Sequence, residues 1–299
     1  MEIRVLRYFL TVVQEGSITQ AAKALHVTQP TLSRQLMELE GELGQQLFIR
    51  GSRRISLTEE GLLLRQRAEE ILSLIDKTTT EFSAMDDASV RGEVRIGCGE
   101  GEPIRFIART LTAMQRSYPF IQTHFCSGNA PDVLDKLDKG LTDFAVVFGP
   151  LDLTQYHYLR LPGIHRWGLL MRKDSPLSQK TVIEPQDLLS IPLIYSAQAW
   201  EHNEFSGWLG FPVEQLHIVA IYNLFYNASL LVQEGLGYAT SFDNLAPTGP
   251  DSPLCHRPFR PPLQAVPYLL WKKSHRFSKA SRIFLDHVRN ELTALGQIE

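Results

Sequence analysis

The feature that most constrains the fold is a pair of short helical patterns near the N-terminus, separated by a few residues. In each pattern apolar residues recur every three or four positions, so they share one face of a helix. They are Ile18, Ala21, Ala22 and Leu25 in the first pattern and Leu32, Leu36, Leu39 and Leu43 in the second. Because alanine side chains are small, another helix can approach the first one closely. We expect two packed helices joined by a turn at His26-Val27.

The start of the second helix is rich in hydrogen-bonding side chains. Ser17 and Thr28 are suitable N-caps, and Pro30 falls in the first turn, where a missing N–H costs nothing. With the leucines buried, the outward-facing residues are Gln29, Thr31, Ser33, Arg34 and Gln35. Gln pairs with adenine, Ser and Thr with several base edges, and Arg with guanine or phosphate. This pattern is typical of a helix-turn-helix over about 18–37 that reads the DNA major groove, and a solvated face in a helical bundle is the alternative.

A basic β-hairpin is predicted directly after these helices. In residues 48–58 the apolar residues Ile49, Ile55 and Leu57 alternate around a Gly-Ser turn. The tip carries Arg50, Arg53 and Arg54. A basic hairpin beside a recognition helix is typical of a wing that contacts backbone phosphates. An ordinary solvated hairpin is the alternative interpretation.

A long helix without Pro, and without Gly after Gly61, is predicted over 59–88. Its apolar seam steps alternately by four and three residues and includes one polar member, Thr78. About 28 helical residues would extend roughly 42 Å, so the helix cannot bury this seam by itself. We expect pairing with a second copy of the chain, and packing on the chain's own body is the alternative. The predicted dimerisation residues are Leu64, Ala68, Ile71, Ile75 and Phe82.

Strands and helices alternate through most of the rest of the chain. Residues 93–149 read strand, helix, strand, helix, strand, which predicts a parallel sheet. Residues 191–242 repeat the theme, and an amphipathic helix over 278–295 closes the chain. We expect two α/β lobes with a ligand crevice at the carboxyl ends of their strands.

Residues 1–65 resemble the winged helix-turn-helix of LysR-type transcriptional regulators. The similar segments are "LRYFLTVVQEGSITQAAKALHVTQPTLSRQLMELEGELGQQLFIR" (6–50) and "LTEEG" (57–61). In that family a long linker helix and an effector domain follow, and the effector domain has two Rossmann-like lobes similar to periplasmic solute-binding proteins. Nearly the whole chain fits this plan. The resemblance implies that Gln29, Thr31, Ser33 and Arg34 face DNA, with Arg53 and Arg54 on the wing.

The same plan implies domain boundaries. They are 1–58 for the winged helix-turn-helix, 59–88 for the linker and dimerisation helix, and 89–299 for the effector-binding domain. Lobe I would span about 91–161 and 267–299, and lobe II about 162–266.

Loops that follow the predicted strands supply the candidate effector-binding residues. They are Gly99, Glu100, Gly101, Asn129, Phe148, Ser196, Trp200, Asn223 and Phe242. Asn129, Ser196 and Asn223 are the polar groups expected to orient a ligand, although each could instead cap the next helix.

The segment "GCGEGE" (97–102) lies where a dinucleotide fingerprint would lie. Glu102 replaces the third glycine, and Glu100 and Glu102 are two negative charges where a pyrophosphate would meet a helix N-terminus. We therefore exclude nucleotide binding here. The LysR family commonly has Ser or Thr in this loop, often facing a carboxylate effector. Either the glutamates point away from the crevice, or the effector carries a cationic or donor-rich group.

Composition leaves little support for other classes of protein. Of 299 residues, 43% are apolar and 21% charged, and residues 1–58 carry +2 of a net charge of −3. Three scattered cysteines indicate neither disulfides nor zinc, so we expect a reducing cytoplasm. The first 16 residues are expected to be mature structure, because no small-residue cleavage site follows their apolar run. No apolar run is long enough for a membrane span, and neither metal-ligand spacing nor a nucleophile elbow is present.

The sequence therefore predicts a homo-oligomeric regulator and not an enzyme. Its expected partners are double-stranded operator DNA, further copies of itself in a dimer and a tetramer, a small-molecule effector of unknown identity, and RNA polymerase. No cofactor, metal or membrane is expected. The alternatives are a small-molecule-binding protein without a regulatory role and an α/β enzyme with an accessory helical domain.

Overall fold

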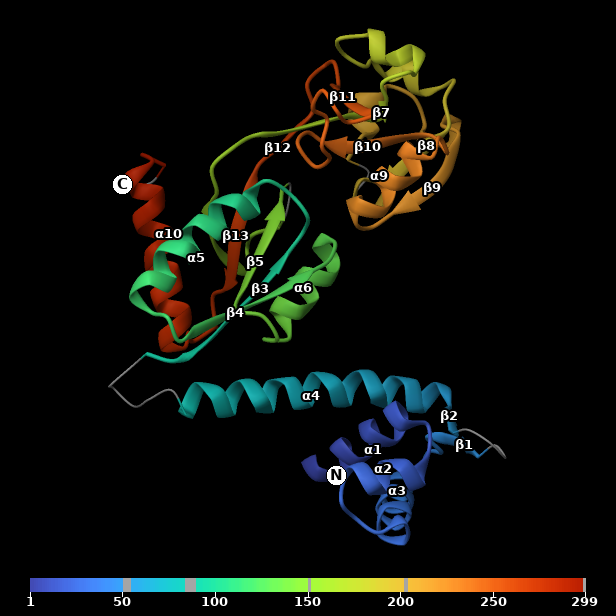
Figure 1. Cartoon of the computed structure of the whole chain (residues 1–299), viewed down its shortest axis with the longest axis vertical. Helices are drawn as coiled ribbons and strands as arrows, with labels where there is room; N and C mark the ends of the chain where they lie inside the picture. Colours follow the sequence, from blue (N-terminus) through green and yellow to red (C-terminus); the bar gives the residue numbers. More distant parts are fainter. Residues whose placement is uncertain (51–54, 84–89, 150–151, 202–203, 298–299) are drawn as a thin grey trace. The chain divides into compact units, whose positions relative to one another are not determined.

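The computed structural model describes residues 1–50, 55–83, 90–149, 152–201 and 204–297, without the side chains of 50, 80–83 and 201 (Figure 1). The chain divides into two compact units, Met1–Ser83 and Ala84–Glu299. Each unit has its own hydrophobic core.

Three helices form the body of the first unit: α1 (Ile3–Glu15), α2 (Ile18–Ala24) and α3 (Gln29–Leu43). Both predicted N-caps are present. The Ser17 hydroxyl accepts the Gln20 N–H at 3.5 Å, and the Thr28 hydroxyl accepts the Thr31 N–H at 3.4 Å. Pro30 lies in the first turn of α3, as predicted.

The turn between α2 and α3 is tight. His26 has φ 54°, in the left-handed region that a residue with a Cβ adopts only at a cost. The next residue, Val27, donates its N–H to the carbonyl of Ala22 at 3.0 Å. Both helices thereby place their apolar faces in one core, where Ala21 and Leu32 are fully buried.

The predicted hairpin is present as β1 (Phe48–Arg50) and β2 (Ile55–Leu57), which pair antiparallel. Arg53 and Arg54 lie outside the described residues. The helix α4 (Glu59–Ser83) follows, and the Thr58 hydroxyl accepts the Gly61 N–H at its start, at 2.9 Å.

The seam of α4 packs largely on the chain itself, which corrects the expectation of an intermolecular seam for its first half. Leu64, Ala68 and Leu72 are buried in the core of the first unit, and Ile71 and Ile75 are half-buried against it. The heptad spacing predicted the buried face correctly, but it cannot distinguish a neighbour in the same chain from one in another. The side chain of Phe82 lies outside the described residues.

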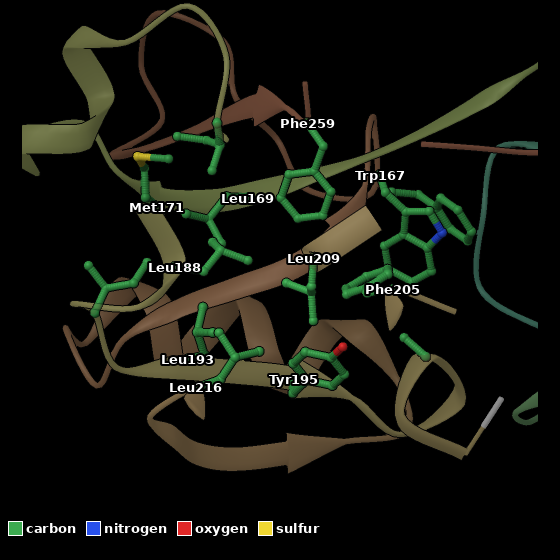
Figure 2. Packing of buried hydrophobic residues seen from close by; sticks show 14 of the residues in the cluster. Trp167, Leu169, Met171, Leu188, Leu193, Tyr195, Phe205, Leu209, Leu216 and Phe259 are labelled. Atoms are coloured by element: carbon green, nitrogen blue, oxygen red, sulfur yellow. The ribbon is translucent and has the colours of Figure 1, made fainter. Parts of the chain in front are cut away.

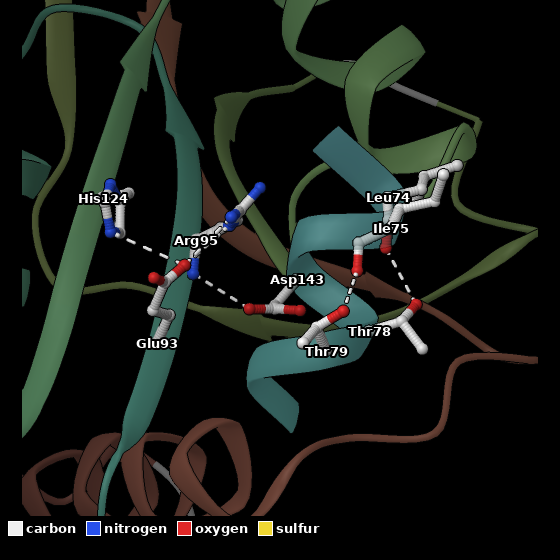
Figure 3. A network of polar contacts seen from close by, with 8 residues as sticks. All are labelled: Leu74, Ile75, Thr78, Thr79, Glu93, Arg95, His124 and Asp143. Atoms are coloured by element: carbon white, nitrogen blue, oxygen red, sulfur yellow. Dashed lines mark hydrogen bonds and ion pairs between the residues drawn. The ribbon is translucent and has the colours of Figure 1, made fainter. Parts of the chain in front are cut away.

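Thr78, the polar residue of the seam, makes its hydrogen bond within α4. The Thr78 hydroxyl donates to the Leu74 carbonyl at 2.8 Å (Figure 3). This hydroxyl therefore requires no partner outside its own helix to be satisfied.

Lobe I of the second unit has a five-stranded sheet with the order β4-β3-β5-β13-β6. Its strands are β3 (Gly92–Cys98), β4 (Ile121–Ser127), β5 (Phe144–Phe148), β6 (Tyr156–Arg160) and β13 (Pro267–Lys272). Its helices are α5 (Pro103–Ser117), α6 (Ala130–Asp138) and α10 (Lys279–Ala294). The buried Asp143 carboxylate accepts the Arg95 N–H at 2.9 Å and ties β3 to the start of β5 (Figure 3).

Lobe II has a sheet with the order β11-β7-β10-β8-β9, and β12 also pairs with β7. Its strands are β7 (His165–Arg172), β8 (Leu193–Ser196), β9 (Ile218–Tyr222), β10 (Tyr238–Phe242), β11 (Leu254–Pro258) and β12 (Gln264–Ala265). Its α-helices are α7 (Ala197–Glu201), α8 (Ser206–Leu209) and α9 (Phe225–Gln233). Three 3-10 helices are η1 (Pro176–Gln179), η2 (Pro185–Leu188) and η3 (Val213–Gln215).

Both sheets are mixed, where the sequence predicted parallel ones. The predicted strands β3, β4 and β5 pair in parallel, and so do β8, β9 and β10. Further strands that the alternation did not predict add antiparallel pairs: β13 pairs with β5 and β6, and β7 pairs with β10 and β11. The chain passes between the lobes twice, from β6 to β7 and from β12 to β13, so two crossing connections join them.

The core of lobe II combines leucine and isoleucine side chains with a group of aromatic rings (Figure 2). Phe205 meets Trp167 edge-on, with ring centroids 4.9 Å apart, and Tyr195 with centroids 5.3 Å apart. Trp167 belongs to this core and also contacts Phe242, with ring centroids 4.1 Å apart.

Candidate functional sites

The N-terminal turn of α3 presents polar side chains to solvent. Thr28, Gln29, Thr31 and Arg34 are exposed and Ser33 is half-buried, whereas Leu32 on the opposite face is fully buried. A rigid helix thus carries hydrogen-bonding groups on one side of its first two turns.

Three of these side chains already have partners. The Thr28 and Thr31 hydroxyls lie 2.8 Å apart and form a hydrogen bond. The Arg34 guanidinium pairs with the Glu38 carboxylate at 2.8 Å, and both side chains remain largely exposed. Such a surface ion pair contributes little to stability, so a phosphate or a base can replace it at low cost.

The wing is partly described. Arg50 pairs with Ile55 across the two strands, but its side chain, like Arg53 and Arg54, lies outside the described set. The role of the three arginines stays a prediction.

Two adjoining cavities lie between the lobes of the second unit. The larger has a volume of about 490 Å³ and the smaller about 50 Å³. The larger is bordered by the loop after β3, by β4 and by the first turns of α9 and the segment after β10. The smaller is lined by residues at or next to the ends of β3, β5, β8, β9 and β10.

Most of the predicted effector residues line these cavities. The smaller cavity is lined by Gly99, Glu100, Asn129, Phe148, Ser196, Asn223 and Phe242, and the larger is lined by Gly99, Glu100 and Gly101. Their roles as ligand contacts stay a prediction.

Trp200 is placed elsewhere. It is 43% exposed, contacts Tyr195 edge-on, and borders a separate depression with Phe211 and Val213. Because α7 begins directly after β8, one further helical turn carries Trp200 away from the crevice.

The three predicted polar groups also have structural partners. Asn129 caps α6 by accepting the Asp132 N–H at 2.9 Å, and the Asn223 side chain accepts the Leu224 N–H at 2.9 Å. Ser196 is buried, and its N–H donates to the Thr240 hydroxyl at 3.3 Å. The capping alternative therefore holds for Asn129, which nevertheless lines the smaller cavity.

Three aromatic side chains that line the smaller cavity, Phe148, Trp167 and Phe242, pack against one another. The Phe242 ring lies 4.5 Å from Phe148 and 4.1 Å from Trp167, measured between centroids. His165 meets Phe148 edge-on at 5.1 Å, and burial lowers the pKa of its imidazole.

Several lining residues were not predicted from the sequence. They are Trp167, Tyr222, Phe225 and Leu245 in the smaller cavity, and chiefly Phe125, Tyr226, Ser229 and Asn244 in the larger. Trp167 lies on β7, which the βα alternation did not predict. The residues after β9 and β10 could have been found by extending each strand-end loop by two or three positions.

The two glutamates of the loop after β3 differ. Glu102 accepts two hydrogen bonds from the Arg105 guanidinium, at 2.8 and 3.1 Å, and this bonding lowers the pKa of the carboxyl group. Glu100 lines both cavities and accepts the N–H of Phe225, the first residue of α9. Glu100 therefore faces the crevice, and the chemical class of the effector stays a prediction.

Within the described ranges, no group of three or more His, Cys, Asp or Glu residues could hold a metal ion. None of the helices in those ranges is both long and apolar enough to cross a membrane.

Two family models together match most of the chain. "Bacterial regulatory helix-turn-helix protein, lysR family" matches residues 3–62, and "LysR substrate binding domain" matches residues 87–293.

Curated relatives include three regulators. The nitrogen assimilation regulatory protein nac of Klebsiella aerogenes is 36% identical over 50% of this chain and 48% of its own length. The regulator BsdA of Bacillus subtilis is 32% identical over 65% and 66%, and the activator CmpR of Synechocystis is 27% identical over 97% and 96%. The chain thus spans about half of the first relative and just under two thirds of the second.

Solved structures share the fold over nearly the full length. CbnR, described as a full-length protein in complex with its target DNA, has a TM-score of 0.71 at 20% identity, covering 97% of this chain and 99% of its own. Full-length BenM has a TM-score of 0.55 at 26% identity, covering 100% and 99%.

Proposed function

Because this chain belongs to the LysR family of bacterial regulatory helix-turn-helix proteins, we propose that it is a sequence-specific DNA-binding transcriptional regulator controlled by a small molecule. In this proposal residues 1–58 bind DNA, residues 59–88 link and dimerise, and residues 89–299 sense the effector between lobe I (about 91–161 and 267–299) and lobe II (about 162–266).

The observation that carries the proposal is the exposed polar turn at the start of α3. Thr28 caps the helix, and Gln29 and Arg34 project from its free face. A capped helix N-terminus with amide, hydroxyl and guanidinium groups suits the donors and acceptors of the major groove. Gln29, Thr31 and Ser33 would contact bases, and Arg34 would contact guanine or a phosphate.

The wing would position the recognition helix. In the sequence, Arg50 is the last residue of β1, and Arg53 and Arg54 fall between β1 and β2, where cationic side chains would reach backbone phosphates. Contacts of this kind fix orientation and affinity but carry no sequence information.

Self-association would pair two DNA-binding heads, which suits a two-fold operator. Since Leu64 and Ala68 are buried within the chain, the exposed leucines of α4 are the better candidates for the dimer contact. A tetramer would be a pair of such dimers.

The effector would bind in the cavities between the lobes and act by a two-state mechanism. A ligand shifts the balance only through its differential affinity for the two states. In this case the states would differ in lobe or subunit geometry and hence in the spacing of the paired heads. We propose neither a catalytic activity nor a resident cofactor. We further propose that the protein is cytoplasmic and contacts RNA polymerase.

The test is a footprint of the full-length protein on the DNA beside its own gene, with and without candidate metabolites. The expected result is a protected, roughly two-fold symmetric site whose pattern changes with one metabolite class. Absence of any sequence-specific protection would contradict the proposal and favour a small-molecule-binding protein without a regulatory role.

A further inference from the structure

The charged groups that line the two cavities have one sign. Among the described lining residues the ionised side chains are Glu100 and Glu102, and neither Lys nor Arg lines either cavity. The Glu102 charge is balanced by Arg105, with which it forms two hydrogen bonds. Glu100 therefore sets the sign of the charge that a ligand meets.

Glu100 also occupies the position that an acid would use. The N-terminus of α9 attracts negative charge through its free N–H groups. Leu224, the N-cap residue, makes no side-chain cap, and the N–H of Phe225 is taken by the Glu100 carboxylate from the other lobe. The neighbouring N–H of Leu224 is taken by Asn223. A carboxylate ligand would have to displace the Glu100 carboxylate from the Phe225 N–H. It would then lie next to a second negative charge, which is unfavourable.

The rest of the larger cavity is mostly apolar. Its lining includes Ile104, Phe125, Phe225, Tyr226, Leu245 and Pro247. Phe125 and Tyr226 are 45% and 67% exposed, so a ligand in this cavity can reach their side chains. A volume of about 490 Å³ is in the range that holds a small organic molecule.

We propose that this cavity takes a small apolar amine whose ammonium group pairs with Glu100, and that Glu100 is the residue that excludes carboxylates. An ammonium group gains the carboxylate as a partner, and the accessible aromatic rings favour a cation further. The inference rests on the proposed function, since it names the ligand class of the same effector site.

The experiment compares three probes that share a 2-phenylethyl group and differ in the polar group on it, on the full-length protein: 2-phenylethylamine, 2-phenylethanol and 3-phenylpropanoate. Binding is measured by calorimetric titration for the wild type and for two variants. Glu100→Gln removes the charge and keeps an oxygen that can accept the Phe225 N–H. Glu102→Gln is the matched control. It removes a negative charge from the same loop, but this charge is already paired with Arg105.

We expect the wild type to bind the amine most tightly and the acid least. Glu100→Gln should weaken amine binding by about tenfold or more, the factor expected when a hydrogen bond to a charged group is lost, and should strengthen acid binding. Glu102→Gln should change both much less. Equal or stronger binding of the acid by the wild type, no detectable binding of the amine, or equal effects of the two variants would overturn the inference.

The ligand class and the proposed regulatory function can fail independently of one another. If an acid binds the wild type and changes its DNA footprint, the ligand class is wrong and the regulatory role stands. If no specific DNA is bound but the amine preference depends on Glu100, the regulatory role fails and the ligand class stands.

Discussion

At the scale of single residues, the first turn of α3 shows which side chains are free to read DNA. Thr28 and Thr31 bond to one another, and Arg34 bonds to Glu38. The Gln29 amide, in contrast, is exposed and makes no hydrogen bond to any other described residue. It can therefore pair with a base without first breaking a contact inside the protein.

Gln29→Ala should weaken binding to the specific site by about 1–3 kcal/mol and relax preference at one base pair, because a bidentate base contact is lost. Selection of binding sites from random DNA measures both effects. Gln66→Ala, which removes an exposed amide from α4, is the control for general effects on folding. An unchanged base preference in the Gln29 variant would contradict its assignment as a base reader.

At the scale of elements, α4 has a buried apolar face and separate exposed leucines. The buried face lies in the core of the first unit. The exposed leucines include Leu63 and Leu74, which are 58% and 37% exposed. Eleven residues correspond to about three turns, so these two leucines lie on nearly the same side of the helix. Leu62, 55% exposed, is about 100° away from Leu63.

If the proposed dimer forms through these leucines, the double variant Leu63→Glu with Leu74→Glu should dissociate it while each chain stays folded, because it would place charges in an apolar contact between copies. Light scattering of the full chain reports the oligomer, and circular dichroism reports the fold. Leu62→Glu should leave the oligomer intact. A dimer that survives the double variant would show that α4 does not form the contact.

At the scale of the whole second unit, an aromatic contact joins the lobes at their crossing connections. His165, at the start of β7, meets Phe148 of lobe I and lies 6.1 Å from Phe242 of lobe II, measured between centroids. Burial lowers the pKa of His165 more than the nearby charges of Asp243 and Glu102 raise it. Burial also lowers the pKa of His256.

These lowered pKa values predict a loss of stability in acid. Below the ordinary histidine pKa of 6.5 the unfolded chain binds a proton that the folded chain resists, so stability is present above that pH and falls as the pH drops through the folded pKa. His165→Phe should reduce this loss and leave the part due to His256. Thermal unfolding measured over a series of pH values tests the slope. An identical slope in the variant would show that His165 does not contribute.

Much of the local structure was predictable from residues close together in the chain. The caps Ser17 and Thr28, the position of Pro30 and the βαβαβ order of residues 92–148 depend on hydrogen bonds and periodicity within a few positions. The strand-end rule also identified most residues that line the smaller cavity. It failed at Trp200, because a short helix turns that side chain away from the crevice.

The sequence by itself determined where the N-terminal helices, the βαβαβ segment of lobe I and many of the other elements form and which of their faces are apolar, because those properties depend on neighbouring residues. Only the tertiary structure decided what each face meets. The seam of α4 packs against helices of the same chain. Antiparallel strands such as β13 pair with strands that lie more than a hundred residues earlier in the sequence. The Glu100 carboxylate accepts a hydrogen bond from the N–H of Phe225, 125 positions away. Such partners are chosen by packing across the whole molecule, which no local pattern records.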